Sequence, residues 1–173
     1  VINSFDVRLS DCLVSRNGED LSLGLGVYLS SSSPYFYHTT VEDNIGYGIY
    51  PTNYSFPYFY DLTNPFNGFN TIRNNGYDEM TYVGGMAFIA DGHNNIVDDN
   101  FGVLLTSYNS PHFFGEDNVT GNYWGNENGP QIGQLLPTGY FVYQPFDNAF
   151  NEPPQLPSLN DYNELRGLYQ RAL

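Results

Sequence analysis

The sequence predicts an all-β fold in which short strands stack as successive coils of a single-stranded parallel solenoid. Three observations support this prediction. The 173 residues include 18 Gly, 16 Tyr and 13 Phe but no Lys, a composition that favours strands and turns over helices. A short unit recurs along the chain, and apolar residues do not follow the 3.6-residue spacing of a helical repeat.

The recurring unit opens with Gly and an apolar residue, continues through a Pro-aromatic step and closes with an acidic or Asn-rich triplet. Its openings are Gly26-Val27, Gly48-Ile49, Gly85-Met86 and Gly102-Val103. A coil of roughly 20 to 25 residues is the natural step of a β-solenoid. We therefore expect about four to six coils.

Stacking places equivalent residues of successive coils about 4.8 Å apart. This predicts two inward columns, one of Val27, Ile49, Met86 and Val103 and one of Phe36, Phe59 and Phe113. The closing triplets predict a third column at a corner, formed by Asn44, Asn75, Asn100 and Asn118. Asn suits such a corner because its side chain bonds to backbone groups and tolerates a left-handed conformation.

One segment resembles a known closing motif. Residues 121–130 read Gly-Asn-Tyr-Trp-Gly-Asn-Glu-Asn-Gly-Pro and are similar to the NYWG…GP signature of right-handed parallel β-helices. With the repeats, the resemblance to pectate-lyase-like and NosD-like secreted proteins covers residues 7–148. It implies a right-handed parallel β-helix, secreted or at the cell surface, in which Trp124 caps the last coil.

The composition changes near residue 150, which predicts three parts. Residues 1–150 are expected to form the C-terminal coils and cap of the β-helix, and residues 151–160 a Pro-rich linker. Residues 161–173 are expected to form a short helix or the start of a following domain, because Leu165, Leu168 and Tyr169 share one helical face.

The charge balance limits the partners of the chain. The chain has nineteen acidic and five basic residues, for a net charge of -14. Such a surface repels nucleic acid, which requires a basic patch. No apolar run approaches the length of a membrane span, so membrane insertion is not expected.

Acidic residues of two closing triplets predict a cation site. Asp98, Asp99, Glu116 and Asp117 would meet at one corner of adjacent coils. Carboxylates that close together repel one another, and a hard cation such as Ca²⁺ would relieve that repulsion. The alternative interpretation is a solvated acidic corner whose side chains point apart.

Aromatic residues flanking the inward Phe column predict a binding face. Strand alternation would turn Tyr35, Tyr37, Tyr58 and Tyr60 outward, with His112 and Phe114 in the same positions on a later coil. An outward aromatic face can stack on sugar rings or dock an extracellular protein. The alternative interpretation is stabilisation of the sheet by pairs of rings on neighbouring coils.

Together these patterns favour a non-catalytic scaffold that binds glycan or a protein partner and is stabilised by calcium. The first alternative is a fragment of a polysaccharide lyase or glycoside hydrolase, for which no catalytic residue is assigned. Arg73 is the one Arg inside the clear repeats and occupies a position that is otherwise acidic. The second alternative is a subunit of an extracellular assembly that associates end to end.

Overall fold

The computed structural model of the chain describes residues 7–18, 24–60, 68–100, 102–109 and 117–152. These residues form a parallel β-solenoid of about four turns, and they contain no helix. They accordingly contain no helix long and apolar enough to cross a bilayer. Residues 153–173 lie outside the described residues; they include all of the expected linker (151–160) except its first two residues, and the whole expected helix (161–173). Four of the predicted column and site residues also lie outside: His112, Phe113, Phe114 and Glu116.

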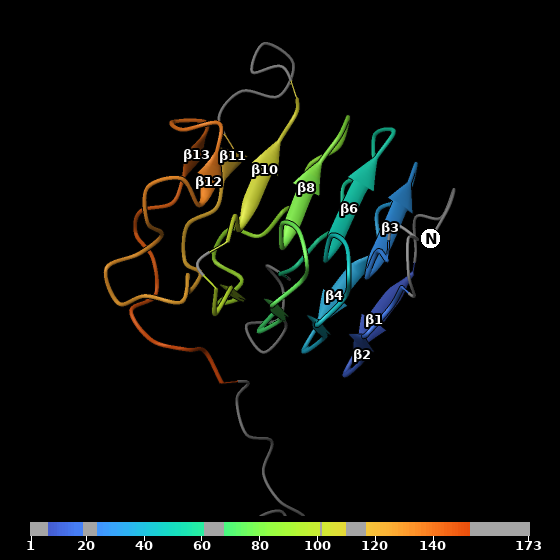
Figure 1. Cartoon of the computed structure of the whole chain (residues 1–173), viewed down its shortest axis with the longest axis horizontal. Helices are drawn as coiled ribbons and strands as arrows, with labels where there is room; N and C mark the ends of the chain where they lie inside the picture. Colours follow the sequence, from blue (N-terminus) through green and yellow to red (C-terminus); the bar gives the residue numbers. More distant parts are fainter. Residues whose placement is uncertain (1–6, 19–23, 61–67, 101, 110–116, 153–173) are drawn as a thin grey trace, which may run out of the picture.

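The largest sheet has five parallel strands, which Figure 1 shows side by side in the order of the chain. They are β3 (Val27–Ser30), β6 (Ile49–Thr52), β8 (Met80–Tyr82), β10 (Leu105–Ser107) and β12 (Leu135–Leu136). Each pairs in parallel with the strand of the next coil. We call this the main sheet.

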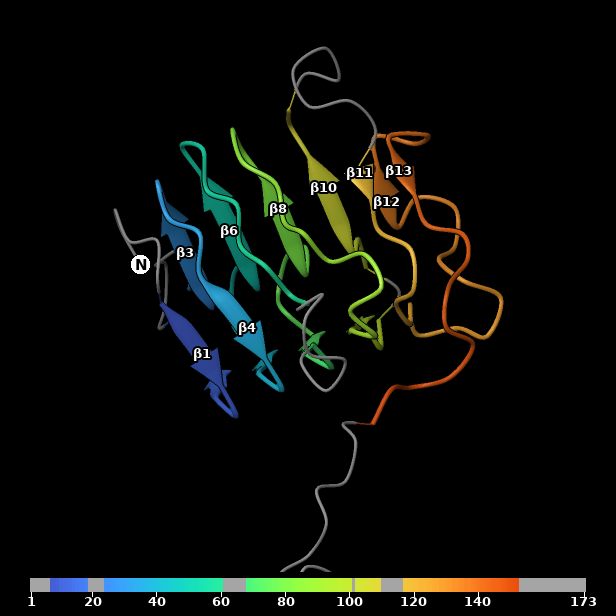
Figure 2. The same cartoon turned by 180° about the vertical axis from the view of Figure 1, so that it is seen from behind.

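The remaining strands form the other sides of the solenoid. The second sheet has four parallel strands: β2 (Leu13–Ser15), β5 (Thr40–Glu42), β7 (Thr71–Arg73) and β9 (Asn95–Val97). A third side pairs β1 (Arg8–Ser10) with β4 (Tyr35–Tyr37), side by side in Figure 2, and continues through single bridges to Tyr58 and Phe88. Near the end of the described chain, β11 (Asp117–Asn118) pairs with β13 (Phe141–Val142).

The first inward column contains different residues from those predicted on its later coils. Val27, Ile49, Met80, Leu105 and Leu135 pair in register, and all five are buried. Met86 and Val103 are half-buried and lie outside this column, so their prediction was wrong. The error arose because Gly was taken to mark each opening, whereas Glu79, Leu104 and Gln134 occupy that position on later coils.

The Phe column is confirmed for the two residues that the structure describes. The rings of Phe36 and Phe59 stack with centroids 4.5 Å apart and an interplanar angle of 6°, and both are fully buried. Ile89 continues this column, since it follows Phe88 as Phe59 follows Tyr58. Aromatic stacking along the core therefore links at least two coils.

Asn side chains form the predicted ladder over part of its length. The side-chain amide of Asn17 donates to Asn44 Oδ1 at 2.9 Å, and that of Asn44 donates to Asn75 Oδ1 at 2.8 Å. Asn100 and Asn118 were wrong predictions, because both are exposed. The backbone N–H of Asn100 bonds to the side chain of Asp98 rather than to a ladder Asn.

Glu79 occupies the place of a fourth Asn in this ladder. Its carboxyl accepts from both the backbone N–H and the side-chain amide of Asn75. These are the same two kinds of donor that Asn75 Oδ1 receives from Asn44. Glu79 thus terminates the ladder inside the solenoid.

A second Asn ladder, which the sequence analysis did not predict, runs along the corner that precedes the second sheet. Asn70 donates to Asn94 Oδ1, and Asn94 donates to Asn122 Oδ1, each at 2.9 Å. Asn122 ends the run by donating to backbone oxygens of Ile89, Val119 and Thr120. All three Asn residues are buried, so the amide chain replaces water as their partner.

Trp124 lies inside the core. Tyr123 pairs with Asn95, which places Trp124 beside Ile96 at the end of a column that includes Val41 and Ile72. Its side chain is 1% exposed, and its Nε1 has no hydrogen-bond partner among the described residues. The chain then continues past it, because Asp147 pairs with Tyr123.

Candidate functional site

The most exposed aromatic cluster lies on the outer side of the main sheet. Tyr28 and Tyr50 occupy paired outward positions on β3 and β6, with ring centroids 6.3 Å apart. Tyr47 and Tyr77 precede β6 and β8, and Tyr47 lies 5.1 Å from both Tyr50 and Tyr77. Tyr108 follows β10 and is 69% exposed. We call Tyr28, Tyr47, Tyr50, Tyr77 and Tyr108 the tyrosine surface.

These tyrosines carry both apolar rings and hydroxyl groups, and the hydroxyl of Tyr28 accepts from Thr52 Oγ1 at 3.4 Å. Tyr77 is 58% and Tyr28 is 39% exposed, whereas Tyr47 and Tyr50 are half-buried beneath them. Partial burial raises the pKa of Tyr47, with a smaller contribution from the nearby Asp78 carboxylate. The Tyr47 hydroxyl therefore keeps its proton and can both donate and accept hydrogen bonds.

The predicted aromatic face is assembled in part. Tyr35 and Tyr58 stack at 4.9 Å, and Phe88 extends the stack at 4.8 Å from Tyr58. Tyr60 contacts Tyr58 edge-on at 6.4 Å, whereas Tyr37 is only 7% exposed and does not point freely outward. Residues 112 and 114 lie outside the described residues. These rings are half-buried, so they present less surface than the tyrosines of the main sheet.

The sequence analysis missed the tyrosine surface because its members come from different parts of each coil. Tyr28 and Tyr50 are strand residues, but Tyr47 and Tyr77 precede their strands by different numbers of residues. One signal was available: Tyr28 and Tyr50 follow the inward residues Val27 and Ile49 in the repeated Gly-apolar-Tyr opening.

The four acidic residues predicted to bind calcium are not all brought together. Asp98 accepts the backbone N–H groups of Asn100 and Gly102, and Asp99 bonds to Asn74. Asp117 is 2% exposed and faces the interior, where burial and then the nearby Asp117 carboxylate raise the pKa of Tyr82. Residue 116 lies outside the described residues. The described residues hold no group of three or more His, Cys, Asp or Glu side chains suited to a metal ion.

Two buried carboxyl groups have strongly altered acidity. Burial raises the pKa of Glu79 to about 8, although its hydrogen bonds from Asn75 act in the opposite direction. Burial likewise raises the pKa of Asp117 to about 7, and its Oδ2 has no hydrogen-bond partner among the described residues. Neither residue is among the lining residues of four pockets that the described residues form.

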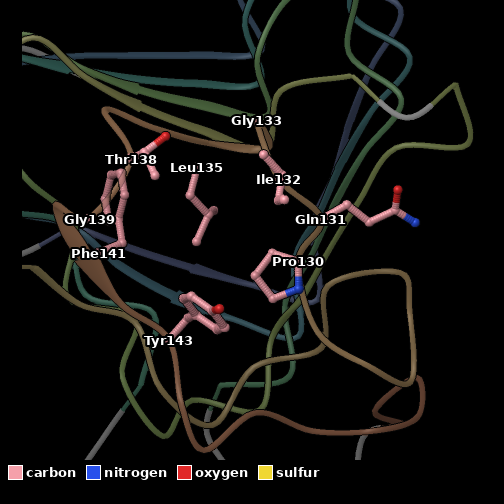
Figure 3. A pocket seen from close by; sticks show the side chains of 9 residues that line it. All are labelled: Pro130, Gln131, Ile132, Gly133, Leu135, Thr138, Gly139, Phe141 and Tyr143. Carbon is pink, nitrogen blue, oxygen red and sulfur yellow. The ribbon is translucent and has the colours of Figure 1, made fainter.

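A small apolar pocket lies at the last strands of the solenoid. Figure 3 shows Pro130 and Ile132 on one side of it, Phe141 on the other and Leu135 between them. Its volume is about 150 Å³. Ile132, one of its lining residues, is fully exposed.

Sequence and structure comparisons add no relative to this description. No family model matches the chain, and neither a curated protein nor a solved structure matches it.

Proposed function

We propose that this protein is a non-catalytic, secreted or cell-surface β-helix scaffold that binds a neutral glycan through the tyrosine surface. The supporting observation is the contact of four tyrosine rings, Tyr28, Tyr47, Tyr50 and Tyr77, across three coils. Rings that are held by one another keep a fixed shape, so stacking on a sugar costs little side-chain entropy.

The charge of the chain defines the kind of glycan. A net charge of -14 opposes uronic or sulfated polymers, and Asp78 adds a negative charge beside Tyr47. A neutral polysaccharide avoids this repulsion, and its hydroxyls find partners in the tyrosine hydroxyls. An extracellular protein that presents a neutral or basic patch is the other partner that this surface fits.

A panel of soluble polysaccharides in affinity electrophoresis tests the proposal. We expect retardation by at least one neutral polymer and a loss of roughly tenfold or more in affinity in Tyr50→Ala/Tyr77→Ala. Tyr143→Ala, which removes a tyrosine from the far end of the solenoid, serves as the matched control. If no neutral polymer binds, or if the double variant binds as well as the parent, the proposed function is wrong.

We further propose that the helix is right-handed and that the segment around Trp124 closes it, as the resemblance to pectate-lyase-like and NosD-like proteins implies. Crossovers between parallel strands are almost always right-handed, which supports the first point. The burial of Trp124 beside Ile96 supports the second, since a large ring at the end of a core column excludes water from it.

Calcium binding remains a separate proposal that rests on the acidic triplets. Asp98 and Asp99 directly follow β9. Each oxygen of Asp98 accepts one backbone N–H group and Oδ2 of Asp99 accepts from Asn74, so each of these oxygens keeps a lone pair for a cation. Isothermal titration with calcium tests this proposal directly. Heat of binding that Asp98→Asn abolishes would support the site, and the absence of any heat would remove it.

The apolar pocket at β12 and β13 favours the assembly alternative over the enzyme alternative. Ile132 and Val142 are exposed beside the pocket, which gives a second copy of the chain an apolar contact. Static light scattering against concentration tests this second candidate. We expect an apparent mass that rises with concentration and falls back in Ile132→Asp; a constant monomer mass would rule it out.

A further inference from the structure

A polar groove lies on the outer face of the second sheet, away from the tyrosine surface. Its floor is made by Thr40, Thr71 and Arg73 of β5 and β7, and Phe69 stands beside it. The segment Phe150–Glu152, which returns across the sheet after β13, forms the opposite wall. The volume of this open groove is about 250 Å³.

Hydrogen bonds hold the returning wall in place. The side chain of Asn95 donates to the carbonyl of Asn151 at 2.9 Å and accepts its backbone N–H at 2.7 Å. The side chain of Asn151 donates to Asp147, which pairs with Tyr123 and lies 3.0 Å from Nδ1 of His93. The groove is therefore preformed, which lowers the entropy cost of binding.

The groove combines hydroxyl, guanidinium and aromatic groups. Thr40 and Thr71 lie on paired positions of neighbouring strands, and the side chain of Arg73 is 45% exposed. Phe150 is 43% exposed and offers an aromatic face opposite these polar groups. This mixture of one apolar wall and a few placed polar groups is typical of small-molecule sites.

The charges of the groove discriminate against anions. The guanidinium of Arg73 lies 2.7 Å from the carboxylate of Glu42, which balances its charge. Glu152 then adds a negative charge to the wall. A carboxylate or sulfate would meet this net negative field, whereas an uncharged hydroxylated ring would not.

We propose that this groove binds a single neutral sugar ring, stacked on Phe150 and hydrogen-bonded to Thr40, Thr71 and Arg73. Pockets for larger ligands measure about 300–1,000 Å³, so a groove of this size suits one ring rather than a chain. The site goes beyond the proposed function, because it lies on a different sheet and uses no residue of the tyrosine surface.

Protein-observed NMR with methyl glucoside, methyl galactoside, methyl mannoside and N-acetylglucosamine tests the proposal, with glucuronate as the anionic comparison. We expect at least one neutral sugar to shift the amide signals of Thr71, Arg73 and Asn151 with a Kd in the millimolar range. Glucuronate should bind roughly tenfold more weakly or not at all. No shift at these amides up to about 50 mM of any neutral sugar would overturn the proposal.

Variants separate this groove from the tyrosine surface. Phe150→Ala and Thr40→Val should each raise the Kd by roughly tenfold, whereas Ser15→Ala, which removes a hydroxyl from β2 of the same sheet, should not. Tyr50→Ala should leave the monosaccharide Kd unchanged, even where it abolishes polysaccharide binding. If Phe150→Ala keeps the parent Kd while its remaining amide signals match those of the parent, the assignment of the groove is wrong.

Discussion

Glu79 shows how one residue can end a repeating interaction inside this solenoid. Its carboxyl receives two hydrogen bonds from Asn75 in the place where another Asn would continue the ladder. Burial raises its pKa to about 8, so the group is mostly protonated at neutral pH. The buried end of the ladder therefore carries no full charge under those conditions.

This acidity predicts a pH-dependent stability that Glu79→Gln removes. The unfolded chain releases the proton above its ordinary pKa of 4.5, whereas the folded chain keeps it until pH about 8. The free energy of unfolding should therefore fall by a few kcal/mol between these pH values and level off above them. Urea unfolding at several pH values measures this fall, which should be much smaller in Glu79→Gln. An equally steep fall in the variant would contradict the assignment.

Gly48 illustrates a glycine that packing requires. A Cβ at this position would lie 2.5 Å from the carbonyl oxygen of Glu79 and 2.6 Å from the side-chain nitrogen of Asn75. The absence of a side chain thus makes room for the Asn ladder beneath the strand.

We expect Gly48→Ala to destabilise the protein by about 2 kcal/mol or more, because neither the backbone nor the ladder can move away without losing hydrogen bonds. Gly84→Ala is the matched control. A Cβ at Gly84 meets only ordinary contacts, so its cost of about 1–2 kcal/mol comes from the left-handed backbone alone. Thermal or urea unfolding compares the two variants. A smaller loss in Gly48→Ala than in Gly84→Ala would disprove the packing argument.

At the scale of the elements, short strands are joined by side-chain ladders as well as by their backbones. Most described strands have three or four residues, so each contributes few backbone hydrogen bonds. The ladders of Asn17, Asn44 and Asn75 and of Asn70, Asn94 and Asn122 add bonds at the corners, where backbone pairing is interrupted.

Asn94→Ala tests the contribution of a central ladder residue. Its removal takes away the acceptor of the backbone N–H of Asn70 and one acceptor of the Asn70 side-chain amide, which keeps its hydrogen bond to the carbonyl of Phe36. Buried donors that lose a partner cost about 1–3 kcal/mol each, so we expect a loss of roughly 2–4 kcal/mol in urea unfolding. Asn128→Ala, at an exposed loop position, should change stability by less than about 0.5 kcal/mol. Equal effects of the two substitutions would contradict a structural role for the ladder.

At the scale of the molecule, net charge and buried acids act in the same direction. The chain carries a net charge of -14, and the repulsion within it decreases as carboxylates gain protons. Asp117, whose pKa is raised from 3.8 to about 7, adds to the effect of Glu79. Its contribution to stability is present in full below pH 3.8 and is lost as the pH rises to about 7.

The intact protein should therefore melt at a higher temperature at pH 5 than at pH 8. Salt distinguishes the two causes, because about 1 M salt screens surface repulsion but affects buried groups much less. In differential scanning calorimetry, we expect the difference in melting temperature between pH 5 and pH 8 to be smaller in Glu79→Gln/Asp117→Asn. The difference that remains in this variant should be the part that salt removes. A higher melting temperature at pH 8 than at pH 5 would contradict both causes.

The sequence predicts those features of the fold that depend on residues close together in the chain. The Gly-apolar-x openings and the Pro-aromatic steps predicted parallel stacking, and the Phe36–Phe59 and Asn44–Asn75 contacts confirm it on the early coils. The later register could not be predicted in the same way. At the position before the inward residue, glycine occurs at Gly26 and Gly48, where a ladder Asn packs under the strand, and Glu79, Leu104 and Gln134 occupy that position on the later coils.

The amino-acid sequence by itself determined that this chain is a stack of short parallel strands with aromatic and Asn columns. This follows because equivalent residues of successive repeats lie next to one another when the coils stack. Only the tertiary structure decided which side chains from different parts of the coils meet. Tyr47 joins Tyr50 and Tyr77, and the segment Phe150–Glu152 crosses to Thr71 and Arg73. Such contacts depend on how each corner turns and where the chain returns, and these are properties of packing rather than of local residue preference.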